Sequence, residues 1–378
     1  MDQAPEAAAA EIVFDPSVPA QAGVGKKFFK SKLFRIGLSY LVAAAGLAWA
    51  FKGTHWKALS GEIAAMRWGW VLPAVLFNIL GTISQGFRWH LLLKPLGSLS
   101  SRKTTQALFS GFFINDILPL RMGELARGYI ASSWMSKEFM AIIPSMVLER
   151  LFEGIWLAIG IGATAIAVRL PEGLDQAAAI FGLAVLALAG VVLFITLKKK
   201  RDDAKRTSEK LRRSRRFEGL RILLVRIEDG FRSIGVGRNF YLAFLVSLLY
   251  FVLQMLSFWS LSKAYGLPFS FWVSSAVFII IIFGTALPGV PANIGTYQFF
   301  CVAALTLFGV GKTEAAGFSL VAFALVTLPA LVIGFFALAR TGMTLASIKE
   351  TVKRYRLLTG AAPLIFSKES TNSCRRRG

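Results

Sequence analysis

Hydrophobic residues in this chain form long runs that are separated by short polar segments. Most runs approach or reach the roughly 17–25 residues that an α-helix needs to cross a membrane. The pattern therefore predicts spanning helices at 36–51, 69–93, 138–168, 175–197, 240–264 and 314–340.

Two further apolar stretches are interrupted near their middle. The stretch 104–136 breaks at Asn115–Pro119 and restarts near Glu124, and the stretch 269–311 breaks at the Pro/Gly-rich segment 284–295. At membrane depth such a break is tolerated only where protein or a water-filled cavity satisfies the freed backbone groups. Each stretch therefore predicts two half-length helices that are joined by an irregular tip.

The basic clusters set the orientation of these segments. They lie at 26–35, at 88–103, at 198–238 (which holds 15 Lys and Arg) and after Arg340. The positive-inside rule places all four in the cytoplasm, which requires both interrupted stretches to re-enter the membrane instead of crossing it. We predict an all-α polytopic membrane protein with about six spanning helices plus two re-entrant helical hairpins in an inverted repeat, as in transporters. The alternative is eight plain spans.

The polar segments divide the chain into three regions. We predict that residues 1–32 form a disordered cytoplasmic N-terminus. We expect 33–345 to form a transmembrane domain and 346–378 to form a basic cytoplasmic tail. Ala48-Trp49-Ala50 also resembles a signal-peptide cleavage site, but we favour an uncleaved first helix because later segments need an anchored start. The basic loop 198–239 predicts an interfacial helix, whose apolar face consists of Leu220, Leu223, Leu224, Ile227, Phe231 and Ile234.

The composition supports a membrane protein and indicates which kinds of partner it binds. Hydrophobic residues make up 55% of the chain, whereas soluble proteins contain about 45–50%. The net charge of +22 would favour nucleic acid in a soluble protein, but here the basic residues flank apolar runs, so topology and anionic lipids explain them better. We expect no nucleic-acid partner. Two cysteines and two histidines, far apart, predict no metal site, and we expect no cofactor.

One group of charged residues lies at the break in the first interrupted stretch. Arg121, Glu124 and Arg127 recur at i, i+3 and i+6, which places them along one helical face. Asn115 lies just before the break. A half-helix that begins near Gly123 would present free N–H groups and a partial positive charge to a phosphate. The alternative is a set of solvated charges at the membrane surface.

A second group lies inside the predicted span 138–168. Glu149 is eight residues from Ala141, or about 12 Å into the helix. A charge near the membrane centre costs roughly 2.5–3.5 kcal/mol on insertion scales, so such groups are expected to be paired and functional. We expect Arg150 to reach Glu153, and Arg121 or Arg127 to meet Glu149. The alternative is an ion-pair network that only fixes helix packing.

The remaining candidates are less charged or lie at a helix end. Arg88, at the end of the second span, is either an interfacial side chain that snorkels or a gate contact for a headgroup. Asn293 and Tyr297 lie in the uncharged tip of the second interrupted stretch, where they could donate hydrogen bonds to a polar headgroup. No residue is assigned a catalytic role. The complete set of candidate substrate-binding residues is Arg88, Asn115, Arg121, Glu124, Arg127, Glu149, Arg150, Glu153, Asn293 and Tyr297.

Several of these motifs together resemble the lysylphosphatidylglycerol synthase transmembrane, or flippase-like, family. They are Gly111 with Asn115, Leu-Pro-x-Arg-x-Gly-Glu-x-x-Arg at 118–127, Glu149-Arg150, and the late Pro-Gly and Ile-Gly tip. The likeness covers about residues 33–345. The resemblance implies an integral membrane protein that moves or handles lipids, and one subgroup of the family is associated with hopanoid lipids.

The chain departs from the family pattern at two site positions. Glu153 stands where the family often has Asp. Gln298 stands where the late tip often ends in Glu, so a carboxylate role at position 298 does not carry over. The 38 residues after Arg340 are also too few for an aminoacyl-transferase domain, so lysyl transfer is not expected.

These observations predict a lipid translocase of the bacterial inner membrane, with both termini in the cytoplasm. It would move a lipid with an anionic or polar headgroup, or an isoprenoid-derived lipid, and would not be an enzyme. One alternative is a membrane transferase acting on a lipid-linked substrate, with Glu149 or Glu124 as general base. Another is a non-catalytic scaffold of lipid biosynthesis. The partners expected are membrane lipids, and a homo-oligomer is left open.

Overall fold

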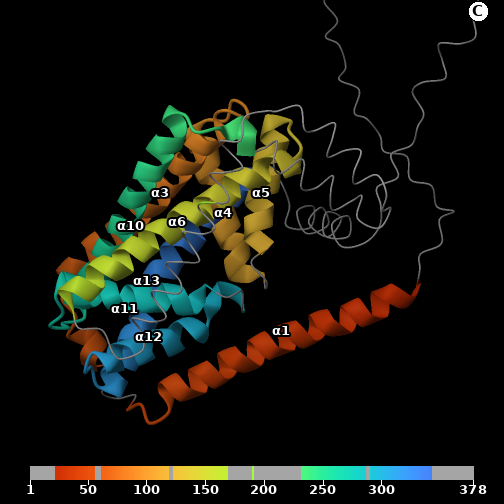
Figure 1. Ribbon diagram of the computed structural model, residues 1–378. Coiled ribbons are helices and arrows are strands. Elements are labelled where there is room, and N and C mark those ends of the chain that lie inside the picture. Colours follow the sequence, from red (N-terminus) through yellow and green to blue (C-terminus); the bar gives the residue numbers. More distant parts are fainter. Residues whose placement is uncertain are drawn as a thin grey trace, which may run out of the picture.

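The computed structural model describes residues 22–55, 61–118, 122–168, 190, 231–286 and 290–342, with only the backbone described for 22–36. Within these residues every regular element is a helix. Figure 1 shows long helices running side by side through the bundle, with shorter helices in pairs beside them. The predicted span 175–197 and most of the predicted interfacial helix lie outside the described residues, apart from Gly190 and the buried Phe231 and Ile234.

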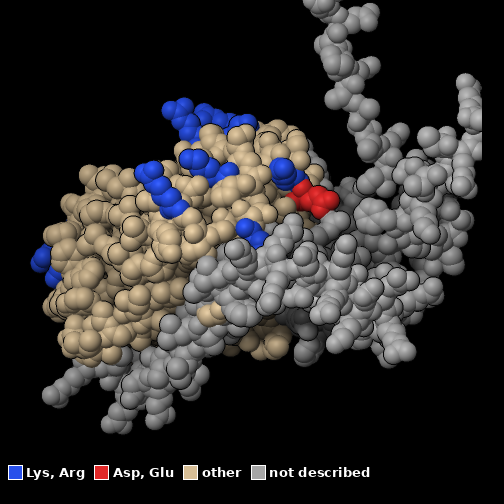
Figure 2. Space-filling view, turned by 45° about the horizontal axis from the view of Figure 1, so that its top comes forward, with Lys and Arg blue, Asp and Glu red and all other residues tan. Residues whose placement is uncertain are grey.

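Four long helices form the body of the bundle, and each confirms a predicted helical segment. They are α3 (Val71–Leu93), α6 (Phe139–Ala167), α10 (Arg238–Ala264) and α13 (Lys312–Ala339). Among the described residues three helices are long and apolar enough to span a membrane: α10, α13, and α3 together with the preceding turn η1 (Trp68–Trp70). The fold is that of an all-α membrane protein, and in Figure 2 most of the described surface carries neither acidic nor basic side chains. In it α3 lies against α10, and both contact α6.

The two interrupted stretches form two helical hairpins, whose paired helices contact each other. They are α4 (Ser101–Ile117) with α5 (Met122–Met135), and α11 (Phe271–Thr285) with α12 (Thr296–Leu307). These helices are about 18–26 Å long at 1.5 Å per residue, which is shorter than a membrane core of about 30 Å. Their re-entry into the membrane, and the direction from which each enters, stay predictions.

The order of elements repeats along the chain. Each hairpin follows one long helix and precedes another, so the pattern long, short, short, long occurs twice. The first helix of each hairpin also starts in the same way: the Ser100 hydroxyl accepts from the Lys103 amide, and the Ser270 hydroxyl accepts from the Val273 amide. Such serine N-caps satisfy backbone donors that have no partner within the helix.

The first helix packs across the tip of the second hairpin. In α1 (Ala22–Phe51), Gly46 lies so close to Gly295 that a Cβ built on it would be 3.0 Å from the Gly295 oxygen. A Cβ on Gly295, whose φ is +87°, would lie 2.3 Å from the Ala43 oxygen. Only glycine combines this left-handed conformation with so close a backbone approach. In Figure 1 most of α1 extends away from the other helices.

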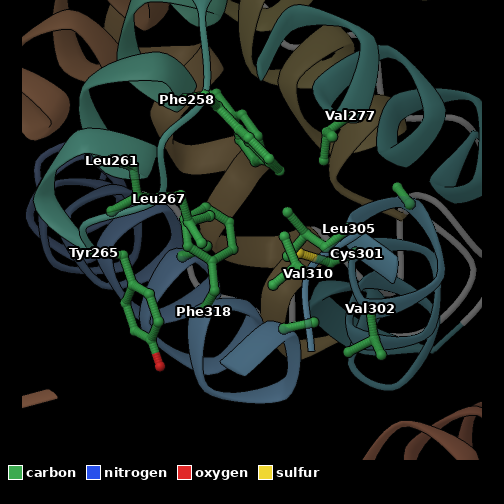
Figure 3. Packing of buried hydrophobic residues seen from close by; sticks show 14 of the residues in the cluster. Phe258, Leu261, Tyr265, Leu267, Val277, Cys301, Val302, Leu305, Val310 and Phe318 are labelled. Carbon is green, nitrogen blue, oxygen red and sulfur yellow. The ribbon is translucent and has the colours of Figure 1, made fainter. Parts of the chain in front are cut away.

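The largest apolar core lies between α10, α11, α12 and α13. Figure 3 shows Phe258, Val277, Leu305 and Phe318 facing a common interior. The Tyr265 hydroxyl points away from this cluster, and it donates to Glu62 Oε2 at 2.7 Å. This core therefore supports the second hairpin, and a separate apolar cluster that includes Phe113, Ile114 and Ile130 supports the first.

Candidate functional site

Six charged side chains from three helices meet inside the bundle. They form a closed ring in which each arginine lies between two glutamates and each glutamate between two arginines. We call this the charge ring, and its three Arg and three Glu give it no net charge. Its members are Arg88 on α3, Glu124 and Arg127 on α5, and Glu149, Arg150 and Glu153 on α6.

One half of the charge ring, the buried arc, consists of Arg88, Glu149 and Arg127. Arg88 Nη2 lies 3.2 Å from Glu149 Oε1, and Arg127 Nη1 lies 2.8 Å from Glu149 Oε2. No side chain in this arc is more than 3% exposed. Removing one partner of a buried ion pair leaves an uncompensated charge, so this arc ties α3, α5 and α6 together.

The other half, the exposed arc, consists of Glu124, Arg150 and Glu153. Arg150 forms ion pairs with Glu124 and, at 2.6 Å, with Glu153. The arc joins the buried one through Arg127 to Glu124 at 2.8 Å and Arg88 to Glu153 at 2.6 Å. The Arg150 side chain is 49% exposed, and those of the two glutamates are 24% and 20% exposed. This arc can therefore meet a ligand directly.

Aromatic rings hold the buried arginines in place. The guanidinium of Arg127 lies 4.8 Å from the centre of the Trp89 ring, and that of Arg88 lies 5.5 Å from the Tyr250 ring. Trp89 is itself fixed, because its indole N–H donates to Ser145 Oγ at 3.0 Å. Cation–π contacts of this kind are strongest where both partners are shielded from water.

Polar side chains on α3 and α10 complete the surroundings of the ring. Gln85 Nε2 donates to Glu153 Oε1 at 3.1 Å, and Arg88 Nη1 donates to Ser247 Oγ at 3.4 Å. Gln85, Ser247 and Tyr250 were not among the candidates predicted from the sequence. A signal existed for Gln85, which lies three positions before Arg88 and therefore on the same face of α3, but nothing in the sequence indicated which part of α10 would face it.

The structure confirms two predicted pairings and overturns two alternatives. Arg127 pairs with Glu149, and Arg150 with Glu153, as expected. The snorkelling interpretation of Arg88 is wrong, because its side chain is fully buried between two glutamates. The description of Arg127 as a solvated surface charge is also wrong, since its side chain is 3% exposed. Arg121 lies outside the described residues.

Asn115 and Gly123 fix the tip of the first hairpin. Asn115 Oδ1 accepts a hydrogen bond from the Gly123 amide at 2.7 Å. A Cβ on Gly123 would lie only 1.8 Å from the Gly111 carbonyl oxygen, so the two backbones are in direct contact. Asn115 therefore already uses one of the N–H groups that were expected to be free for a phosphate at the start of α5.

Asn293 and Tyr297 belong to the second hairpin and are not part of the ring. The Tyr297 ring packs against Phe323, with 5.7 Å between centroids, and the Asn293 carbonyl accepts from Thr296 Oγ1 at 2.9 Å. Within the described residues neither side chain shares a hydrogen bond or ion pair with the charge ring. The turn η3 (Pro291–Asn293) does contact α4, which brings the second tip against the first hairpin.

The charge pattern decides what the site can bind. The exposed arc places one guanidinium between two carboxylates, so it offers both a donor for an anionic oxygen and acceptors for an ammonium or hydroxyl group. In the described part of the chain no group of three His, Cys, Asp or Glu side chains is placed to hold a metal ion. The arrangement suits a polar headgroup that carries both kinds of group.

Comparison with known proteins assigns a family to this arrangement. No protein of curated function matches the sequence. Residues 36–334, which include both hairpins and the whole charge ring, match the family described as the lysylphosphatidylglycerol synthase TM region. This match covers most of the chain. The chain therefore belongs to the lysylphosphatidylglycerol synthase TM-region family and is an integral membrane protein of lipid metabolism.

Proposed function

We propose that this protein is a lipid translocase of the bacterial inner membrane, with both termini in the cytoplasm. One observation carries the proposal: the charge ring is buried on one side and exposed on the other. The buried arc supplies a fixed scaffold, and the exposed arc supplies charges that a ligand can reach. Intramembrane charges that face a bundle interior commonly mark a substrate pathway.

The exposed arc would take the headgroup while the tails stay in lipid. Arg150 has a planar fork of donors that matches two phosphate oxygens. Glu124 and Glu153, on either side of it, would accept hydrogen bonds from an ammonium or hydroxyl group. Because two carboxylates flank one guanidinium, a headgroup that is both anionic and cationic fits better than a purely anionic one. This sharpens the expectation of an anionic or polar headgroup.

A membrane transferase is the second candidate function, and the geometry argues against one of its two bases. Glu149 is fully buried and already paired with Arg88 and Arg127, so it has no face that meets a substrate. Glu124 is partly exposed, but its carboxylate is already ion-paired with Arg150 and Arg127, so a substrate would have to displace an arginine to reach it. A translocase therefore accounts for the positions of these charged side chains better than a transferase does.

Lipid movement in proteoliposomes tests the proposal. We would measure the leaflet exposure of fluorescent phosphatidylethanolamine and phosphatidylglycerol with the wild-type protein, with Arg150→Gln and with Glu124→Gln. Arg102→Gln is the matched control, because Arg102 is exposed on α4 and lies outside the ring. We expect at least a tenfold loss of rate in both ring variants and none in the control. Movement of neither lipid by the wild type, or equal rates in all variants, would show that the proposal is wrong.

A further inference from the structure

The helices α5 and α6 are joined by two ion pairs of different kinds. Arg127 with Glu149 is buried on both sides, whereas Glu124 with Arg150 is partly exposed on both sides. The other pairs that involve Glu124 and Arg150 lie within a single helix: Glu124 with Arg127 on α5, and Arg150 with Glu153 on α6. Only one of the two links between these helices is therefore open to water or to a ligand.

The ring can open at Glu124–Arg150 without leaving a charge unpaired. When this pair separates, Glu124 keeps Arg127, and Arg150 keeps Glu153. Both side chains are partly exposed, so another polar group can reach them once they separate. The Arg127–Glu149 pair cannot open in the same way, because water does not reach it, and a buried charge that loses a partner is strongly disfavoured.

We propose that Glu124–Arg150 is an exchangeable latch on the first hairpin. A phosphate oxygen of a lipid headgroup replaces Glu124 on Arg150, and this end of α5 is then released from α6. The buried pair Arg127–Glu149 stays closed and acts as the pivot. The identity of the ligand rests on the proposed function, whereas the latch itself rests only on the difference in exposure between the two ion pairs that join α5 to α6.

The release of α5 would move the whole first hairpin. The backbones of α4 and α5 touch at Gly111 and Gly123, and Asn115 bonds the two helices across the tip, so they shift as one unit. Because α4 contacts η3, the shift reaches the tip of the second hairpin. Headgroup binding at the first hairpin would in this way shift the tip of the second. A translocase needs such coupling in order to alternate access.

Distances between spin labels test the latch directly. The labels would be placed at Ile117→Cys, at the end of α4, and Ile159→Cys, on α6, both of which are about half exposed. Cys301 and Cys374 would be replaced by alanine. The full chain would be studied in vesicles of digalactosyldiacylglycerol, a lipid without phosphate, alone and with added phosphatidylethanolamine or phosphatidylglycerol.

We expect one main distance for the wild type in digalactosyldiacylglycerol alone and for Arg150→Lys, which keeps the ion pair. Glu124→Gln and Arg150→Gln should show a second distance in the same vesicles, shifted by several ångströms. The wild type should gain this second distance when phosphatidylethanolamine or phosphatidylglycerol is added. A change with only one of the two lipids supports the latch and identifies the headgroup that opens it.

Identical distances in Glu124→Gln, Arg150→Gln and the wild type, in every vesicle, would overturn the latch. Lipid movement measured on the same vesicles separates this failure from failure of the proposed function. Movement without a second distance removes the latch and leaves the translocase. A lipid-dependent second distance without any movement leaves the latch and removes the translocase.

Discussion

The two hairpins have the same layout but are held together by different interactions. In the first, α4 and α5 meet backbone to backbone at Gly111 and Gly123, and ion pairs join α5 to α6. In the second, a Cβ on Gly284 would meet the ring of Phe300 at 2.2 Å, and apolar side chains surround both helices. None of the described residues of α11 and α12 is charged.

Both hairpins pack in apolar cores, so the difference lies in the ion pairs that the first hairpin adds to this packing. Ion pairs are directional and can exchange partners, whereas apolar packing is not directional and depends on close fit. The first hairpin can therefore change its ion pairs when a polar ligand binds, whereas the second hairpin keeps its packing. Four substitutions test this contrast, taken from the largest expected effect to the smallest.

Gly123→Ala should be the most damaging change. Its Cβ would lie 1.8 Å from the Gly111 carbonyl oxygen, which is backbone and cannot turn away. We expect a loss of about 3 kcal/mol or more, seen as a loss of monodisperse protein in detergent. Gly284→Ala should cost less, because the Phe300 ring can turn. Gly162→Ala, which has open space around it, is the control, and a Gly123→Ala protein as stable as this control would disprove the backbone contact.

Glu149→Gln should be the next most damaging. It leaves Arg88 and Arg127 buried with one fewer compensating charge, and breaking a buried pair costs about 3–5 kcal/mol. The measurement is the thermal midpoint of the purified protein. Since Glu149 connects all three helices of the ring, an unchanged midpoint would mean that the buried arc does not hold the bundle together.

Gln298→Ala should have a moderate effect in the second hairpin. Gln298 Oε1 accepts from the Gly295 amide at 2.7 Å at the start of α12, and the loss of such a cap costs about 1 kcal/mol. The thermal midpoint should fall by less than in Glu149→Gln. A fall as large as in that variant would indicate that the polar tip contributes as much to stability as the buried ion pairs do.

Arg150→Gln should have the smallest effect on stability. A partly exposed ion pair contributes about 0.2–1 kcal/mol, and both glutamates beside Arg150 keep another arginine. The midpoint should therefore stay close to that of the wild type, while lipid movement is lost. If Arg150→Gln and Glu149→Gln were equally destabilising, the division into a buried and an exposed arc would be wrong.

Much of the site could be predicted from local sequence. The breaks after Asn115 and at 284–295 predicted both hairpins, and charges inside an apolar run marked Glu149, Arg150 and Glu153. The i, i+3 spacing also predicted that Arg150 reaches Glu153. Arg88 was harder to place, because a helix end beside an aromatic residue is as typical of an interfacial arginine as of a buried one.

The sequence by itself determined the helices, the breaks and the identity of the charges, because hydrophobic period and local spacing act within one element. Only the tertiary structure decided that the six charges close into a ring, because Arg88, Arg127 and Glu149 lie on three helices whose packing is set by contacts distant in sequence. It also decided which half of the ring is buried. Burial fixes how strongly each ion pair is held, and it thereby separates the scaffold from the groups that a headgroup can reach.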